Sequence, residues 1–224
     1  SVLGHVLMHQ TINGNEAILQ MEQTGDYPDI IVGCTGGGSN LAGLMFPFLG
    51  QQLRGGQKID IIGCEPLSCP SFTKGKYAYD HGDMARMTPL IKMHTLGSDF
   101  LPPANHSGGL RYHGMSYHLS HLYDLGLMRA KAYGQKDCFE AGVIFGKQEG
   151  IIPAPEGNHA VKGAIDAALE CKEKGESKTI LFNLCGHGHF DMTAYDDYFS
   201  GKLADDFYDE TSANKSLSQL PEIA

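Results

Sequence analysis

The stretch Asp29-Ile30-Ile31-Val32-Gly33-Cys34-Thr35-Gly36-Gly37-Gly38-Ser39-Asn40-Leu41-Ala42-Gly43 decides the fold. Its β-prone run, three glycines and helix-compatible end predict a strand, a tight turn and a helix. The first N–H groups of a helix have no internal partner and carry partial positive charge. Glycines let the backbone curl around an oxyanion, and Ser39 and Asn40 add side-chain donors. The junction therefore predicts a phosphate site.

Two common phosphate motifs do not fit this junction. A Walker loop needs a lysine followed by serine or threonine, whereas Ser39-Asn40 follows the glycines here. A dinucleotide fingerprint needs a last glycine where Leu41 stands. A glycine-rich structural turn without a ligand remains the alternative for this segment taken alone.

Composition narrows the class of protein. The 224 residues are 42% hydrophobic, which is enough for a full core without disulfides or metal. Seventeen basic and 26 acidic residues give a net charge of −9, which argues against nucleic acid as the main partner. The six cysteines form no C-x-x-C pair, so we expect a reducing cytoplasm and no zinc cluster. We also expect no membrane span and no signal peptide.

Periodicity along the chain predicts alternating helices and strands. Helices are expected over residues 1–24 in two pieces broken at Asn13-Gly14, over 40–52 with an interruption at Pro47, and over 136–148 and 159–174. Strands are expected over 58–64 and 178–184, the latter being the clearest buried strand. This order predicts an α/β fold, a three-layer parallel sheet with helices on both faces. Ligands bind at the carboxyl edge of such a sheet, where Gly36–Gly38 and Cys185-Gly186 would meet.

Residues 67–123 are irregular and rich in glycine, proline and histidine. The segment is too long for a simple connecting loop in a compact domain, so we predict a functional role for it. Within it, residues 105–114 have the glycine density of a loop that approaches a ligand. The histidine spacings match no ligand pattern, and no metal site is predicted.

Several motifs resemble one enzyme family. They are Thr35-Gly36-Gly37-Gly38-Ser39-Asn40, Gly63-Cys64-Glu65-Pro66, the run 149–160 (EGIIPAPEGNHA) and Asn183-Leu184-Cys185-Gly186-His187-Gly188. In this order they resemble the C-terminal half of the tryptophan synthase β subunit. The runs 75–80, 109–114 and 215–221 resemble its second, diverged type. The resemblance covers nearly all of the chain.

The resemblance implies a fold-type-II enzyme that uses pyridoxal 5′-phosphate. Its phosphate would be held by Gly36, Gly37, Gly38, Ser39 and Asn40. Cys185, followed by Gly186, stands where the family usually has a serine that meets the pyridine nitrogen. A thiol cannot support a charged ring nitrogen, so the ring would be a mild electron sink suited to β-replacement.

Three more residues receive roles from the resemblance. Glu156 matches the family's acid near the ring, and Gly109 with Arg111 lies on the loop that faces the amino-acid substrate. We therefore expect Glu156 and Arg111 to be catalytic. Two alternatives remain open: Cys185 as a buried core cysteine and Glu156 as a helix N-terminal acid.

The implied reaction condenses indole with L-serine to L-tryptophan and water, in a homodimer with an α subunit as a further partner. A serine or threonine deaminase, a threonine synthase, or a non-catalytic phosphate-binding module are the alternatives. Residues 1–203 would form the cofactor domain of a larger enzyme, and 204–224 an acidic, surface-bound or loose tail. The family's Schiff-base lysine lies in the half before Ser1, so we expect this chain alone to be inactive.

Overall fold

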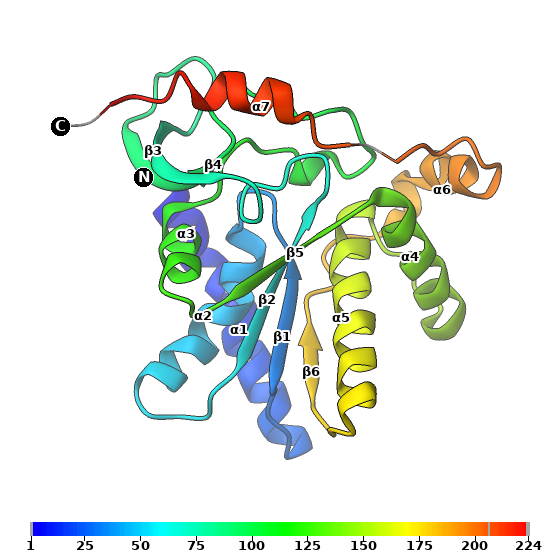
Figure 1. The fold of residues 1–224 in the computed structure, drawn as a ribbon. Coiled ribbons are helices and arrows are strands. Elements are labelled where there is room, and N and C mark those ends of the chain that lie inside the picture. The colour runs from blue at the N-terminus through cyan, green and yellow to red at the C-terminus, as the bar shows by residue number, and fades with distance from the viewer. Residues whose placement is uncertain (1, 206, 223–224) are drawn as a thin grey trace.

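A four-stranded parallel sheet lies at the centre of the fold (Figure 1). The computed structural model describes residues 2–205 and 207–222, with side chains from residue 4 onward. The strands run in the order β5-β2-β1-β6. Their bounds are Ile30–Cys34 for β1, Asp60–Pro66 for β2, Arg129–Tyr133 for β5 and Ile180–Phe182 for β6. The predicted parallel sheet is confirmed, and all its carboxyl ends point to the top of Figure 1.

Helices cover both faces of this sheet (Figure 1). One face carries α1 (Val2–Thr24), α2 (Ser39–Leu53) and α3 (Tyr117–Asp124), and the other carries α4 (Gln135–Glu149) and α5 (Pro155–Lys174). Side chains alternate along β1 because successive residues of a strand point to opposite faces. Ile31 packs among the residues of α1 and α2, whereas Val32 packs against α5. The three-layer α/β architecture is therefore confirmed.

The expected break at Asn13-Gly14 is wrong, because α1 is one continuous helix. Gly14 is there for close packing: a Cβ at this position would lie 2.3 Å from the carbonyl oxygen of Leu44 on α2. Gly43 of α2 is equally close to α1, since its Cβ would meet the Gln10 carbonyl oxygen at 2.4 Å. Helix α2 also continues through Pro47, where an interruption was expected.

The strand expected over 178–184 is shorter and more exposed than predicted. Only Ile180–Phe182 pairs, as an edge strand against β1, and its residues are half-buried. Strand β5 was missed because, as the other edge strand, it carries Arg129 and Lys131 among its alanines. Helix α5 begins at Pro155, earlier than expected, because a proline suits the first helical turn.

The irregular segment 67–123 contains local structure. An antiparallel hairpin joins β3 (Lys76–His81) to β4 (Leu90–Thr95), and a short 3-10 helix, η1, spans Gly108–Leu110. Another 3-10 turn, η2 (Gly188–Phe190), and α6 (Met192–Phe199) follow β6.

The segment predicted as an acidic tail contains a packed helix. Helix α7 spans Glu210–Leu217, with Ala213 and Ser216 buried. Ala213 packs with Leu96 and Phe100, so α7 covers the loop after β4. Asp206 and residues 223–224 of the predicted tail lie outside the described residues.

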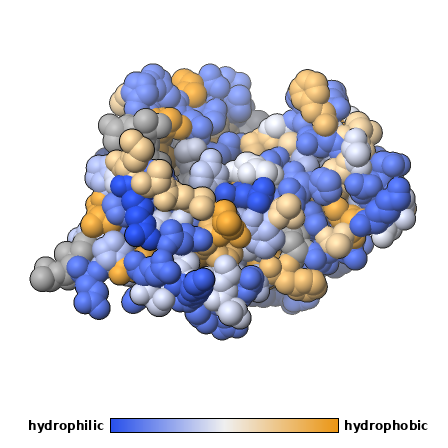
Figure 2. Space-filling model, turned by 90° about the horizontal axis from the view of Figure 1, so that it is seen from above, coloured by the Kyte–Doolittle hydropathy of each residue, from blue (hydrophilic) through white to orange (hydrophobic). Residues whose placement is uncertain are grey.

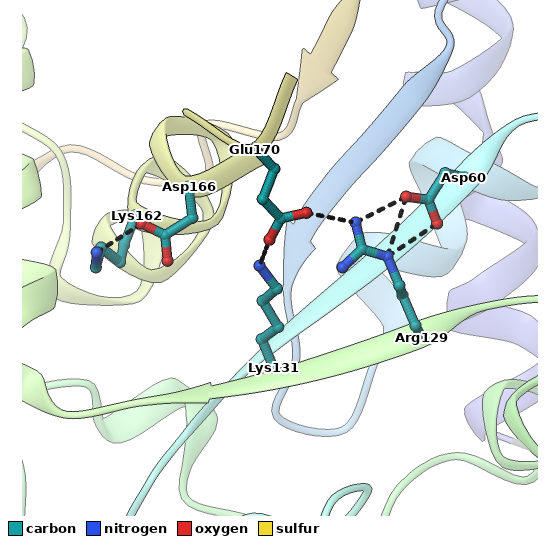
Figure 3. Close-up of polar contacts among 6 residues, drawn as sticks. All are labelled: Asp60, Arg129, Lys131, Lys162, Asp166 and Glu170. Atoms are coloured by element: carbon teal, nitrogen blue, oxygen red, sulfur yellow. Dashed lines mark hydrogen bonds and ion pairs between the residues drawn. The ribbon is translucent and has the colours of Figure 1, made fainter. Parts of the chain in front are cut away.

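An ion-pair network ties β2, β5 and α5 together (Figure 3). Arg129 Nη2 lies 2.8 Å from Asp60 Oδ2 and 3.6 Å from Glu170 Oε2. Lys131 pairs with the other oxygen of Glu170. Because these side chains are partly exposed, each pair contributes little free energy, and the network mainly fixes how α5 lies across the two strands.

Candidate functional site

A small pocket lies over the glycine loop that follows β1. Its volume is about 190 Å³. It is lined by Val6, Cys34, Gly36, Gly37, Gly38, Ser39, Asn40, Gly109, Leu110 and Tyr112. Seen from above, the face at the carboxyl ends of the strands is mainly hydrophilic with scattered hydrophobic residues (Figure 2). All five residues predicted to hold a phosphate therefore line one pocket at the predicted edge.

The loop presents a row of backbone donors. Within residues 2–205 and 207–222, none of the N–H groups from Gly36 to Leu41 donates to a protein acceptor. Gly38, the N-cap of α2, has a φ of 92°, a conformation that L side chains rarely adopt. No acidic residue lies in the first turn of α2. The loop and helix end together suit an anion.

Gly36 and Gly37 have different surroundings. A Cβ on Gly36 would lie 2.7 Å from the Gly109 carbonyl oxygen, so this glycine lets η1 approach the loop. A Cβ on Gly37 would meet only Tyr112, at 3.9 Å. Gly36 therefore closes one wall of the pocket, and Gly37 keeps space open inside it.

The carboxyl ends of β1 and β6 meet beside this pocket. Cys185 Sγ lies 3.3 Å from Cys34 Sγ, which confirms that the two glycine-rich strand ends share one edge. The hydrogen bond with Cys185, together with burial, raises the pKa of the Cys34 thiol. The same hydrogen bond lowers the pKa of Cys185. Cys34 is thus the partner that keeps its proton.

Glu156 and Gly109 also meet at this edge. Glu156 lies in the first turn of α5, and its Oε1 accepts a hydrogen bond of 2.8 Å from the backbone N–H of Gly109. Gly186, with a φ of 72°, accepts from the Ala154 N–H at 3.3 Å, just before α5. The start of α5 therefore holds both the η1 loop and the turn after Cys185.

Arg111 is the exception among the predicted site residues. Its guanidinium is exposed, and Nη2 donates a 2.5 Å hydrogen bond to the Pro102 carbonyl oxygen. The side chain does not line the pocket. The structure brings the Gly109 end of this loop to the site but not the Arg111 head group.

Three further residues belong to the site. Thr35 Oγ1 is buried without a partner in the described part of the chain, immediately before the glycines. Cys34 lines the pocket, and Asn183 donates through Nδ2 to Asn40 Oδ1 at 2.7 Å. Each lies at a strand end in a motif quoted above, so the carboxyl-edge rule applied to every polar residue there would have found them.

Other cavities lie away from the glycine loop. A larger cavity of about 800 Å³ lies between α2, α3 and the hairpin, but its lining is mainly apolar and does not suit an anion. Within the described ranges, no group of three or more His, Cys, Asp or Glu side chains is arranged to hold a metal ion. None of the helices in those ranges has both the length and the apolar character needed to cross a bilayer.

Comparison with known proteins identifies the sequence family. Residues 8–186 match the family described as "Pyridoxal-phosphate dependent enzyme". This range includes the glycine loop, η1, the start of α5 and the turn at Cys185-Gly186.

Similar curated proteins carry the name tryptophan synthase beta chain. "Tryptophan synthase beta chain 2" of Methanosarcina mazei is 57% identical over 91% of this chain and 46% of its own length. The Aquifex aeolicus protein of that name is 57% identical over 92% and 48%. "Tryptophan synthase beta chain" of Pyrococcus horikoshii is 51% identical over 99% and 48%. The chain thus spans about half the length of these relatives.

A solved structure shares the fold. The fungal L-serine ammonia-lyase from Rhizomucor miehei superimposes with a TM-score of 0.59 over 85% of this chain and 56% of its own. The sequences are only 16% identical, so this likeness concerns the fold alone.

Proposed function

Because this chain belongs to the family of pyridoxal-phosphate-dependent enzymes, we propose that it holds the cofactor in a tryptophan-synthase-β-type lyase. The reaction joins indole to L-serine by β-replacement. The observation that supports this proposal is the row of N–H groups from Gly36 to Leu41, none of which donates to an acceptor in the described part of the chain. These groups lie at a pocket that is also lined by Ser39 and Asn40.

The phosphate of the cofactor fits this row of donors. The loop offers N–H groups, the α2 N-terminus adds partial positive charge, and no carboxylate in the first turn opposes an anion. Gly37 leaves the space into which a phosphate oxygen fits, since a Cβ there would have no neighbour closer than 3.9 Å. Ser39 and Asn40 add side-chain donors to the same wall.

The thiol of Cys185 is proposed to meet the ring nitrogen. The two Sγ atoms are 3.3 Å apart, and the raised pKa of Cys34 beside the lowered pKa of Cys185 favours Cys34 as the hydrogen-bond donor. The Cys185 S–H is then free to point elsewhere. When bound, the cofactor withdraws electrons from the amino-acid substrate. A thiol does not keep the ring nitrogen charged, so that withdrawal is moderate and suits replacement at the β-carbon.

Glu156 is proposed to hold and move a proton at its second carboxylate oxygen. The Gly109 N–H fixes Oε1, and this bond orients Oε2. Arg111 is proposed to face the amino-acid substrate from the same loop, after leaving the Pro102 carbonyl oxygen. Among the described residues, no lysine lines the pocket, so a lysine that would bind the cofactor covalently is proposed to come from outside these lining residues.

The names of the relatives support a proposal about the assembly to which this chain belongs. We propose a cytoplasmic homodimer that also binds an α subunit, because the similar proteins are named as beta chains. Residues 1–203 would be its cofactor domain, and 204–224 a C-terminal segment on its surface.

Binding and turnover test this proposal. In equilibrium dialysis of the full-length protein that carries these residues, pyridoxal phosphate should bind at least about tenfold more tightly than pyridoxal, which lacks the phosphate. The same protein should form tryptophan from L-serine and indole. Equal binding of the two ligands contradicts the phosphate site. Release of pyruvate without indole, and no tryptophan, would instead favour a deaminase.

A further inference from the structure

Two cysteine side chains lie close together at the carboxyl edge of the sheet. The Sγ atoms of Cys34 and Cys185 are 3.3 Å apart, although 151 positions separate them in the sequence. Cys34 is the last residue of β1. Cys185 follows β6, the edge strand that pairs with β1. Cys34 and Cys185 are both present as thiols and not as a disulfide.

Access to the two sulfurs differs. Cys34 is 3% exposed, whereas Cys185 is only partly buried and follows half-exposed residues of the edge strand. The hydrogen bond from Cys34 lowers the pKa of Cys185, while partial burial and the nearby Glu156 carboxylate oppose this effect. A reagent that enters from solvent therefore meets Cys185 first, and Cys34 lies behind it as a second thiol.

Helix α5 packs closely against the backbone at Cys185, so formation of a disulfide would depend on movement of the two side chains. A Cβ on Gly157 would lie 2.9 Å from the Cys185 carbonyl oxygen, which shows how closely α5 supports this turn. An S–S bond is about 2.05 Å long, so the sulfurs must approach by roughly 1.2 Å. Rotation about the two Cα–Cβ bonds would supply a movement of this size.

We propose that Cys34 and Cys185 are an oxidation site that closes reversibly to a disulfide when the protein meets a hydroperoxide. The Cys185 thiolate attacks the peroxide oxygen, the O–O bond breaks, and Cys185 becomes a sulfenic acid while the hydroxide released takes up a proton. The Cys34 sulfur then attacks the Cys185 sulfur and displaces water. In total, two thiols and one hydrogen peroxide give one disulfide and two waters.

The consequence for the cofactor rests on the proposed function. A disulfide sulfur has no proton to donate, so closure removes the donor that Cys185 would offer to the ring nitrogen. Bound cofactor would in turn shield Cys185 from the peroxide. In a reducing compartment such a bond is transient, which is typical of redox-sensing cysteines.

Peptide mass spectrometry tests the disulfide without any assay of activity. The full-length protein, freed of cofactor, is treated with hydrogen peroxide, alkylated and digested without reductant. The peptides that contain Cys34 and Cys185 should appear linked, at about 2 Da below their summed mass, and dithiothreitol should separate them. Cys34→Ala and Cys185→Ser should each abolish the link, whereas Cys171→Ser, on α5, should retain it.

Several outcomes would overturn the proposal. They are a link between Cys34 and Cys64 on the neighbouring strand, irreversible oxidation of Cys185 to sulfinic acid without a link, and unreacted thiols at peroxide levels that oxidise free cysteine. A second arm adds pyridoxal phosphate before the peroxide. A parallel sample receives pyridoxal, which lacks the phosphate. If the disulfide forms more slowly with pyridoxal phosphate than with pyridoxal, the result supports both the disulfide and the cofactor site. A link that forms at the same rate keeps the disulfide and contradicts the proposed function.

Discussion

Asn183 Nδ2 donates a 2.7 Å hydrogen bond to Asn40 Oδ1 and thereby connects the end of β6 to the first turn of α2. The same nitrogen also lies 3.4 Å from the Asn40 carbonyl oxygen. Because Asn40 Oδ1 is occupied in this way, its amide nitrogen is the end left to face the pocket. Asn183 therefore orients a proposed phosphate donor without lining the pocket itself.

Asn183→Ala should weaken the binding of pyridoxal phosphate by about 2- to 10-fold, the worth of one hydrogen bond. Binding of pyridoxal should change less, because the Asn40 amide is proposed to contact only the phosphate. Equilibrium dialysis with both ligands measures the difference. Asn15→Ala, at an exposed position of α1, is the matched control and should change neither affinity. An equal loss for both ligands would mean that Asn183 has only a general structural role.

Alanine at Gly36 and at Gly37 should have separable effects. At Gly36 the new methyl meets backbone atoms at 2.7 Å, so we expect a loss of about 2 kcal/mol or more in the free energy of unfolding. At Gly37 the methyl has room, so stability should change by less than about 1 kcal/mol while phosphate-dependent binding falls. Urea denaturation and dialysis measure the two quantities.

Gly108→Ala is the control for both variants. It lies on the neighbouring η1 turn, where an added Cβ meets nothing within 4 Å. Its stability and cofactor affinity should stay close to those of the unchanged protein. If Gly37→Ala behaves like Gly108→Ala in the binding assay, the pocket over the loop is not the phosphate site.

Strand ends were easier to predict from the sequence than the elements between them. The run Ile30–Cys34 is fully buried, so its apolar pattern and the following glycines identified both the strand and the turn. Gly14 misled because a glycine reads locally as a break, whereas here it serves contact with Leu44, which lies 30 positions away in the sequence. Tertiary packing of this kind leaves no local signal.

The side-chain contacts within the site could not be predicted from the sequence, because they also depend on tertiary packing. Cys185 was placed by its motif, but nothing in the sequence pairs it with Cys34. The glycine density around Gly109 indicated a loop near a ligand, yet its bond to Glu156 depends on how η1 lies over α5. For Arg111 the sequence motif predicted a site residue, but its side chain donates to the Pro102 carbonyl oxygen and does not line the pocket.

Gly97→Ala should loosen helix α7. A Cβ at Gly97 would lie 2.1 Å from Ser216 Oγ and 2.8 Å from the Ser216 carbonyl carbon, and the φ of 93° adds strain. Ser216 Oγ also accepts the Asp99 N–H at 3.1 Å, a bond that displacement of the helix would break. We expect a loss of about 2 kcal/mol or more in stability and faster amide exchange in α7.

Gly25→Ala is the control that separates the steric clash with Ser216 from the backbone strain in the Gly97→Ala variant. Gly25 has a φ of 70° with nothing within 4 Å of an added Cβ, so its substitution should cost only about 1 kcal/mol. Similar losses for the two variants, with unchanged exchange in α7, would show that α7 contributes nothing to the stability of this loop.

Glu65 should make stability fall with rising pH. Burial raises the pKa of this carboxyl from 4.5 to about 7, although the Thr73 hydroxyl and the N–H groups of Phe72 and Thr73 donate to it and oppose the shift. Because the folded-state pKa is the higher one, the contribution is fully present below about pH 4.5 and is lost as pH rises to about 7. The loss amounts to about 3 kcal/mol.

Glu65→Gln removes the titration and should flatten this slope. The amide gives up an acceptor for one of the three donors, so the variant should be less stable than the unchanged protein at pH 5. By pH 8 the difference between the two should shrink by about 2–3 kcal/mol, because only the unchanged protein loses the contribution. Urea denaturation at both pH values measures it, with Glu16→Gln at an exposed site of α1 as control. A stability difference that stays constant from pH 5 to 8 would mean that the Glu65 carboxyl is ionised throughout, held so by its three donors.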